Sequence, residues 1–194
     1  MRKTALCGAI TLTLFAAATP AVAGPSGQAL SFTCAGCHGT DGSSVGPSSP
    51  TLAGMPKDAF VDAMKAYKAG ERNPTIMDRI AKGYTDDQFV AMAEFFAAQK
   101  RHTMAQEHDA AKAATGAKLH EEYCEKCHED GGMSGEDSAP LAGQWAKYLE
   151  FTMADYKAEK RDMPKKMKKK IEAVEKDHGD AGVEALIQYY ASQK

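Results

Sequence analysis

The chain has 194 residues, with 26 acidic and 24 basic side chains and a formal net charge of −2. This mildly acidic balance excludes a protein that binds nucleic acid through a basic surface. The length suits one domain or two, and nothing after Gly24 is apolar enough to form a membrane span.

The first 23 residues have the pattern of a secretory signal peptide. Arg2 and Lys3 give a positive start, residues 5–18 are mostly apolar, and Ala-Val-Ala at residues 21–23 forms a small-residue cleavage site. A retained membrane helix is the alternative, but the apolar stretch is short for one. We expect residues 1–23 to be removed together with Cys7, which leaves 171 residues with a net charge of −4. Export of this kind predicts a periplasmic protein.

One five-residue motif, Cys-X-X-Cys-His, occurs twice, at residues 34–38 and 124–128. It is the attachment signature of c-type haem, in which both thiols form thioethers with the porphyrin and the histidine becomes the proximal iron ligand. Thiol exchange or zinc would account for a lone Cys-X-X-Cys, but a histidine after both copies favours haem. We therefore predict two covalently bound haem c groups, held by Cys34, Cys37, Cys124 and Cys127, with proximal ligands His38 and His128.

Matching segments indicate that the chain is an internal duplication. The matches are residues 50–54 with 140–143, Tyr67-Lys-Ala with Tyr156-Lys-Ala, Arg72 with Arg161, and residues 95–100 with 189–194. Their common order predicts two tandem domains, at residues 24–101 and 114–194, joined by a polar linker at residues 102–113.

Each predicted domain contains three helical patterns and no convincing strand. The first pattern carries the haem motif (residues 29–37 and 117–127), the second has an apolar stripe (60–67 and 145–156), and the third lies near the end of the domain (89–96 and 183–190). A capping box at Thr85 and Gln88 opens the third helix of the first half. We predict an all-α fold of two class I cytochrome c-like domains, each wrapped around one haem.

A low-spin electron carrier needs a sixth iron ligand, commonly Met or His. Met77 follows Pro74 by three residues and His38 by 39, and Met167 follows Pro164 and His128 by the same intervals. Met167 also has the spacing of a core stripe with two later apolar residues, Ile171 and Val174, which leaves Met163 as the alternative. We predict Met77 for haem 1 and favour Met167 over Met163 for haem 2.

The remaining histidines, His102, His108, His120 and His178, are expected at the surface, with His120 as an alternative sixth ligand. The ring N–H of His38 is expected to donate to a carbonyl in the Gly46-Pro47 turn. The second half has Glu136-Asp137 at that place. A lysine-rich run at residues 165–170 is either a solvated helix face or a surface that steers an acidic partner.

The mature chain resembles the diheme cytochrome subunit of flavocytochrome c sulfide dehydrogenase. The segments that carry the resemblance are residues 34–47, 75–84, 116–120, 123–128, 141–145, 179–182 and 190–193, of which Leu-Ala-Gly-Gln-Trp at 141–145 is among the more specific. The resemblance implies a heterodimer with an FAD-containing flavoprotein that oxidises sulfide. Electrons would pass from the flavin through both haems to a soluble acceptor such as a small cytochrome c.

On this interpretation the chain is an electron-transfer subunit and not an enzyme by itself. It has no dinucleotide-binding glycine motif after a strand and no free cysteine for sulfur chemistry, as expected if the partner chain performs both functions. One alternative is a free diheme cytochrome c that shuttles electrons to a terminal oxidase. Another is a diheme enzyme of peroxidase type, which needs an open iron position. The order of electron flow between the haems stays open.

Overall fold

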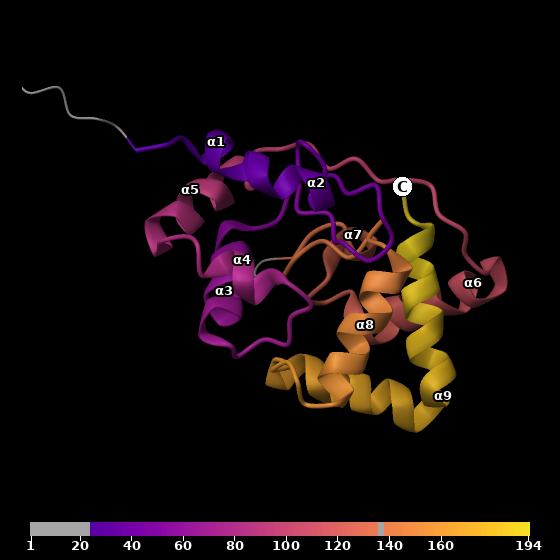
Figure 1. The fold of residues 1–194 in the computed structure, drawn as a ribbon. Coiled ribbons are helices and arrows are strands. Elements are labelled where there is room, and N and C mark those ends of the chain that lie inside the picture. Colours follow the sequence, from indigo (N-terminus) through magenta and orange to yellow (C-terminus); the bar gives the residue numbers. More distant parts are fainter. Residues whose placement is uncertain (1–23, 136–137) are drawn as a thin grey trace, which may run out of the picture.

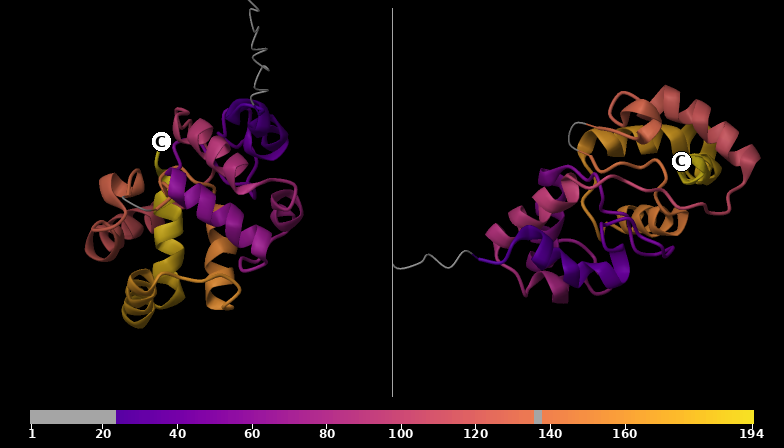
Figure 2. Two further views of the ribbon diagram at one scale, coloured as in Figure 1. Left: turned by 90° about the vertical axis from the view of Figure 1, so that its left-hand side faces the viewer. Right: turned by 90° about the horizontal axis from the view of Figure 1, so that it is seen from above.

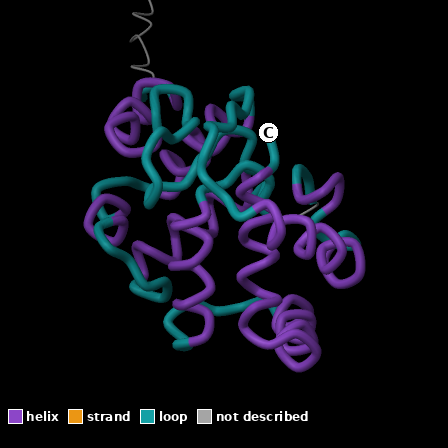
Figure 3. The backbone as a smooth tube through the Cα atoms, turned by 90° about the vertical axis from the view of Figure 1, so that its right-hand side faces the viewer, coloured by secondary structure: helices purple, strands orange, loops and turns teal. Residues whose placement is uncertain are grey.

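The computed structural model describes residues 24–135 and 138–194, and these residues form helices and loops without a strand (Figure 1, Figure 3). The predicted signal peptide, Cys7 and the pair Glu136-Asp137 lie outside the described residues. The elements are α1 (Gly27–Ser31), η1 (Phe32–Cys34), α2 (Ala35–His38), α3 (Lys57–Ala69), α4 (Met77–Ala81), α5 (Asp86–Ala97), α6 (Ala110–Leu119), η2 (His120–Cys124), α7 (Glu129–Gly132), α8 (Ala146–Lys157) and α9 (Lys165–Ser192).

The predicted helical patterns fall on helix in the structure, except that residues 125–127 in the second haem motif form a turn. The first pattern corresponds to α1, η1 and α2 in one half and to α6 with η2 in the other. The second corresponds to α3 and α8, and the third to α5 and the last part of α9. Thr85 makes both capping-box hydrogen bonds with Gln88 at the start of α5, which confirms that prediction.

Helix α9 consists of two helical segments that meet at a kink at Gly179, and the predicted third pattern of the second half lies in the segment after this kink. Gly179 has φ 64° and ψ −166°, a conformation that glycine adopts without steric cost. The segment after this kink occupies the place of α5 in the first half. At the other end of the second half, α6 begins at Ala110, inside the predicted linker, because Asp109 caps it. The domain boundaries themselves stay a prediction.

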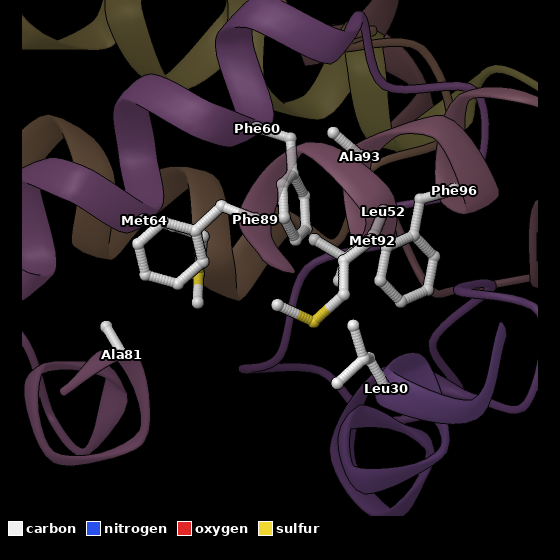
Figure 4. Packing of buried hydrophobic residues seen from close by; sticks show 9 residues of the cluster. All are labelled: Leu30, Leu52, Phe60, Met64, Ala81, Phe89, Met92, Ala93 and Phe96. Atoms are coloured by element: carbon white, nitrogen blue, oxygen red, sulfur yellow. The ribbon is translucent and has the colours of Figure 1, made fainter. Parts of the chain in front are cut away.

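Two separate hydrophobic cores form, one in each half of the chain. The first contains Phe60, Met92 and Phe96 at its centre, with the Phe60 and Phe96 rings 5.5 Å apart (Figure 4). Cys34 and Met77 border this core. The second contains Val174 and Leu186, and Cys124 borders it. Each haem motif thus lies against the core of its own half.

A glycine contact repeats in both halves and brings the first helix against the third. A Cβ atom on Gly27 of α1 would overlap the carbonyl of Ala91 in α5, and one on Gly116 of α6 would overlap that of Ala185 in α9. Only glycine permits this close approach of two backbones. The repeated crossing supports each haem motif on the third helix of its half.

The two halves lie side by side and are joined by hydrogen bonds (Figure 2). At one end of the contact Gln144 bonds to Thr51, and at the other end Asn73 donates to Asp155 over 2.8 Å. Within the described residues no helix has both the length and the apolar character needed to cross a bilayer.

Two candidate haem centres

The first Cys-X-X-Cys-His motif lies on nearly continuous helical backbone. Cys34 ends η1, and Cys37 and His38 belong to α2. Residues three and four apart share one helix face, so the two thiols and the imidazole lie on the same side. The four described cysteines are free thiols, which is the state that covalent haem attachment requires.

His38 is held in a defined orientation. Its side chain is buried, and Nδ1 lies 2.7 Å from the carbonyl oxygen of Pro50. Burial lowers the pKa of His38 and the hydrogen bond to Pro50 partly offsets this, so a neutral imidazole is favoured. Nδ1–H donating to a carbonyl leaves Nε2 to bind a metal.

The prediction that a backbone carbonyl accepts from His38 is confirmed. Its predicted place in the Gly46-Pro47 turn is wrong, because the carbonyl belongs to Pro50. The Gly46 carbonyl accepts from the Ser44 hydroxyl over 3.3 Å. The chain then continues to Pro50, which lies beside His38. Sequence spacing could have indicated Pro50 because Pro140 stands at the same distance after His128.

The second motif begins differently, with one turn of π-helix, η2, that ends at Cys124. Gly116 lies eight residues before Cys124, whereas Gly27 lies seven before Cys34. The wider π turn accommodates the additional residue while both glycine crossings are kept. This insertion cannot be seen in the Cys-X-X-Cys-His motif itself.

His120 is the first residue of the π turn and is buried. The prediction that it lies at the surface is therefore wrong. Its side chain is 2% exposed, Nδ1 lies 2.9 Å from the Tyr190 hydroxyl, and Nε2 contacts the Glu125 carboxylate. Both ring nitrogens are therefore occupied, which argues against His120 as an iron ligand. His102, His108 and His178 are exposed, as expected.

His128 has a different hydrogen-bond partner from His38. Its Nδ1 lies 3.2 Å from the hydroxyl of Ser138, and burial, followed by the charge of His120, lowers its pKa. The carbonyl of Pro140, at the place of Pro50, accepts from Arg101 over 3.4 Å. Burial lowers the pKa of this arginine to about 10. Burial lowers the pKa of His38 and of His128, but different groups orient the two rings.

The predicted sixth ligands lie at helix starts. Met77 is the first residue of α4, partly buried against the first core. Met167 is the third residue of α9 and is also partly buried. Met163 precedes α9 and lines a cavity of about 850 Å³, together with charged residues such as Lys168 and Glu172.

Sequence reasoning missed a polar cluster between the two halves. Arg72 Nη2 donates to the Tyr148 hydroxyl over 3.2 Å, and Arg72 and Arg161 stack on Tyr67 and Tyr156 with 4.6 and 4.7 Å to the ring centroids. The equal spacing of each arginine after its tyrosine was visible as part of the repeat. Its role in joining the halves was not, because that role depends on tertiary contacts.

The residues present fit a covalent haem in each half. Each site offers two free thiols, a histidine whose Nδ1 is within hydrogen-bond distance of a partner, and a partly buried methionine. These are the groups that hold haem c. Fold and site together define a c-type cytochrome with two haem domains.

Comparison with known proteins agrees with that class. Residues 26–100 match the Cytochrome c family, and residues 111–189 match the family described as Cytochrome C oxidase, cbb3-type, subunit III. Cytochrome c4 of Pseudomonas aeruginosa is 30% identical over 165 residues, which cover 81% of this chain and 82% of the relative. The chain belongs to the diheme cytochrome c family of the cytochrome c4-like kind, and it carries two covalent haem c groups.

Two further likenesses bear on structure and function. The solved structure of reduced recombinant cytochrome c4 from Pseudomonas stutzeri superposes with a TM-score of 0.74 at 26% identity, covering 89% of this chain and all of that one. The cytochrome subunit of sulfide dehydrogenase from Chlorobaculum tepidum is 43% identical over 70 residues. That match covers 36% of this chain and 63% of the relative.

Proposed function

We propose that the protein is the electron-transfer subunit of a periplasmic flavocytochrome. It accepts electrons from an FAD-containing flavoprotein subunit that oxidises sulfide, and relays them to a soluble acceptor such as a small cytochrome c. The observation that carries this proposal is the 43% identity to a sulfide dehydrogenase cytochrome subunit over 70 residues. The predicted signal peptide at residues 1–23 supports export to the periplasm.

We assign the haem attachment to Cys34 and Cys37 in one half and to Cys124 and Cys127 in the other. The axial pairs are His38 with Met77 and His128 with Met167, and Met163 is the alternative for the second haem. The hydrogen-bond contacts of Nδ1 in both rings, and burial that lowers the pKa of both histidines, support the histidine assignments.

The arrangement of α9 supports Met167 over Met163. Met167, Ile171 and Val174 are spaced to share one helix face, and Val174 is fully buried. Ile171 and Val174 belong to the core that Cys124 borders. Met163 lies before the helix and lines a cavity with charged residues, which Ile171 also borders. The spacing along α9 is therefore what supports Met167 as the ligand.

The residues of this chain suit electron transfer that requires little change in the structure of either haem site. A bound haem supplies an iron that changes by one electron between its ferric and ferrous states. His38, which is buried, and His128, which is partly buried, are held by hydrogen bonds before the haem is reduced. The two methionines are partly buried. Hydrogen bonds between the halves keep the two sites in a constant relation.

Purification from the native host tests this function. We expect the chain to copurify with a stoichiometric FAD flavoprotein, and sulfide to reduce both haems of that complex. Recovery of the chain alone, with no reduction by sulfide after a flavoprotein fraction is added back, would contradict the proposal.

A second candidate is a free diheme cytochrome that carries electrons to a terminal oxidase. The likeness to cytochrome c4 over 82% of that relative favours it. In that case the isolated chain would be oxidised rapidly by membranes containing the oxidase and would bind no flavoprotein. Parallel assays with sulfide and with such membranes separate the two candidates.

A further inference from the structure

One side chain of the second half is inserted into the haem-attachment loop of the first. Gln144 precedes α8 and is 2% exposed, and its amide makes two hydrogen bonds to the backbone of Thr51, which is 3% exposed. The Thr51 N–H donates to Oε1 over 2.9 Å, and Nε2 donates to the Thr51 carbonyl over 3.2 Å. The amide thus pairs with Thr51 as a neighbouring strand would.

The peptide group that Gln144 contacts is also the one that orients His38. The nitrogen of Thr51 and the carbonyl oxygen of Pro50 belong to the same peptide unit. Gln144 accepts from its N–H, and the carbonyl lies 2.7 Å from His38 Nδ1. A peptide whose N–H is hydrogen-bonded is more polarised, so its carbonyl becomes a stronger acceptor.

Trp145 adds a second contact to the same loop. Its indole Nε1–H donates to the Ser44 carbonyl over 3.2 Å. Ser44 is fully buried, its N–H donates to the Thr51 hydroxyl, and its own hydroxyl lies 3.3 Å from the carbonyl oxygens of both Cys37 and Gly46. The loop beside the first haem motif is therefore held at two neighbouring points by the second half.

Within residues 24–135 and 138–194, the first half makes no equivalent contact with the second. Met55 follows Leu-Ala-Gly where Gln144 does in the repeat, and a thioether cannot make a paired amide contact. His128 also has the Ser138 hydroxyl, not a peptide carbonyl, beside Nδ1. The arrangement at His38 thus belongs to one of the two sites.

We propose that Gln144 is a positioning residue for haem 1. Acting through the Pro50–Thr51 peptide, it strengthens the hydrogen bond from His38 to the Pro50 carbonyl. A stronger hydrogen bond makes the imidazole a better electron donor to iron, which favours the ferric state and lowers the reduction potential. The second domain thereby sets the potential of the haem in the first. This inference rests on His38 as an axial ligand, and not on sulfide oxidation.

The test uses the full-length holoprotein with Gln144→Met, a change of similar size that removes both amide hydrogen bonds. In a spectroscopic redox titration we expect one of the two midpoint potentials to rise. A tenfold change in the equilibrium constant for reduction, about 59 mV, is the upper expectation. NMR of the reduced protein should show the ring N–H signal of His38 shifted and that of His128 unchanged.

Gln106→Ala is the matched control. Gln106 also makes two amide hydrogen bonds to backbone of the second half, at Gln144 O and Ala146 N, but the structure gives none from it to Thr51. We expect both midpoint potentials to stay at their original values. Equal shifts in the two variants would overturn the proposal, because they would reflect general loosening of this segment.

Trp145→Phe keeps the test decisive if Gln144→Met does not fold. It retains an aromatic ring and removes only the donor to Ser44. We expect a smaller rise of the same midpoint. Shifts of both potentials, or of neither, would overturn the proposal. These measurements need no flavoprotein, so their outcome is independent of whether the sulfide function is correct.

Discussion

The Tyr148 hydroxyl accepts a hydrogen bond of 3.2 Å from Arg72 across the boundary between the two domains. Burial alone would raise the pKa of Tyr148, but the charges of Arg72 and Arg161 lower it below its usual value. Two arginines at equivalent places in the repeat thus both lower the pKa of a single tyrosine. The duplication has produced an interface that is not symmetric.

Loss of this contact should destabilise the joined domains. We expect Arg72→Ala to lower the free energy of unfolding by about 1–2 kcal/mol, because it removes a charged donor from the partly buried hydroxyl of Tyr148. Denaturant unfolding of the holoprotein measures this. Tyr148→Phe and the double variant complete a mutant cycle, in which we expect a coupling of at least about 0.5 kcal/mol. Additive effects would show that the two side chains do not interact.

The repeated glycine crossings should tolerate no side chain. We expect Gly116→Ala to lower the free energy of unfolding by about 1–3 kcal/mol, because its Cβ would overlap the Ala185 carbonyl. Gly46→Ala is the control, since a Cβ there meets no atom within 4 Å, its φ is not positive, and it lies outside the haem motif. If thermal unfolding of the two holoproteins shows equal losses, the crossing is not as tight as described.

The ligand of haem 2 can be decided by two substitutions. We expect Met167→Ala to abolish the sulfur-to-iron absorption band of one haem, because Met167 shares the helix face of Ile171 and Val174. Met163→Ala should leave both contributions in place. The reverse pattern in the oxidised absorption spectrum would transfer the role to Met163.

The lysine-rich run at the start of α9 should steer an acidic electron acceptor. All five of its lysines are exposed, and none takes part in the ion pairs found within residues 24–135 and 138–194. Lys170 lies 5.9 Å from the centroid of the Tyr123 ring, beside the second haem motif. The run is thus a local positive surface on a chain of net negative charge.

We expect Lys165, Lys166 and Lys169→Glu together to slow electron transfer to an acidic soluble cytochrome by about tenfold or more at low salt. Stopped-flow rates across a range of ionic strength measure this, and the difference should shrink at high salt through screening. The control reverses three lysines, Lys57, Lys82 and Lys100, which are exposed in the first domain. Equal slowing by both sets would indicate an effect of net charge alone.

The start of α6 should contribute acid sensitivity. The Asp109 carboxylate accepts from the N–H groups of Lys112 and Ala111, and these bonds hold its pKa below the usual 3.8. A carboxyl group whose pKa is lowered by folding stabilises the folded state above about pH 3.8. This stabilisation is lost as the pH falls through the pKa of the folded state. Asp109→Asn retains a capping oxygen without a charge.

We therefore expect the stability of Asp109→Asn to depend less on pH below about 4 than that of the original protein. Asp109→Ala should be less stable than Asp109→Asn at every pH, because it removes the cap. Urea unfolding at a series of pH values gives both comparisons. If Asp109→Asn loses stability at low pH as much as the original protein does, this carboxyl group does not contribute to the acid sensitivity.

Local patterns determined much of the fold. Helical periodicity located the second and third helices of each half, and the spacing of Thr85 and Gln88 identified a capping box that the structure contains. The two Cys-X-X-Cys-His motifs identified the cofactor, because two thiols and a histidine on one helical turn suffice for that chemistry. These features depend on residues close together in the chain, so they could be found without its fold.

Other features were decided only by tertiary structure. The π turn that buries His120 satisfies a distant constraint, the crossing of Gly116 with Ala185. The partner of His38 and the contact of Gln144 with Thr51 join residues 12 and 93 positions apart. Sequence by itself established two haem domains and their attachment residues. What surrounds each haem ligand was decided by packing, because buried polar groups must find partners wherever the fold brings them.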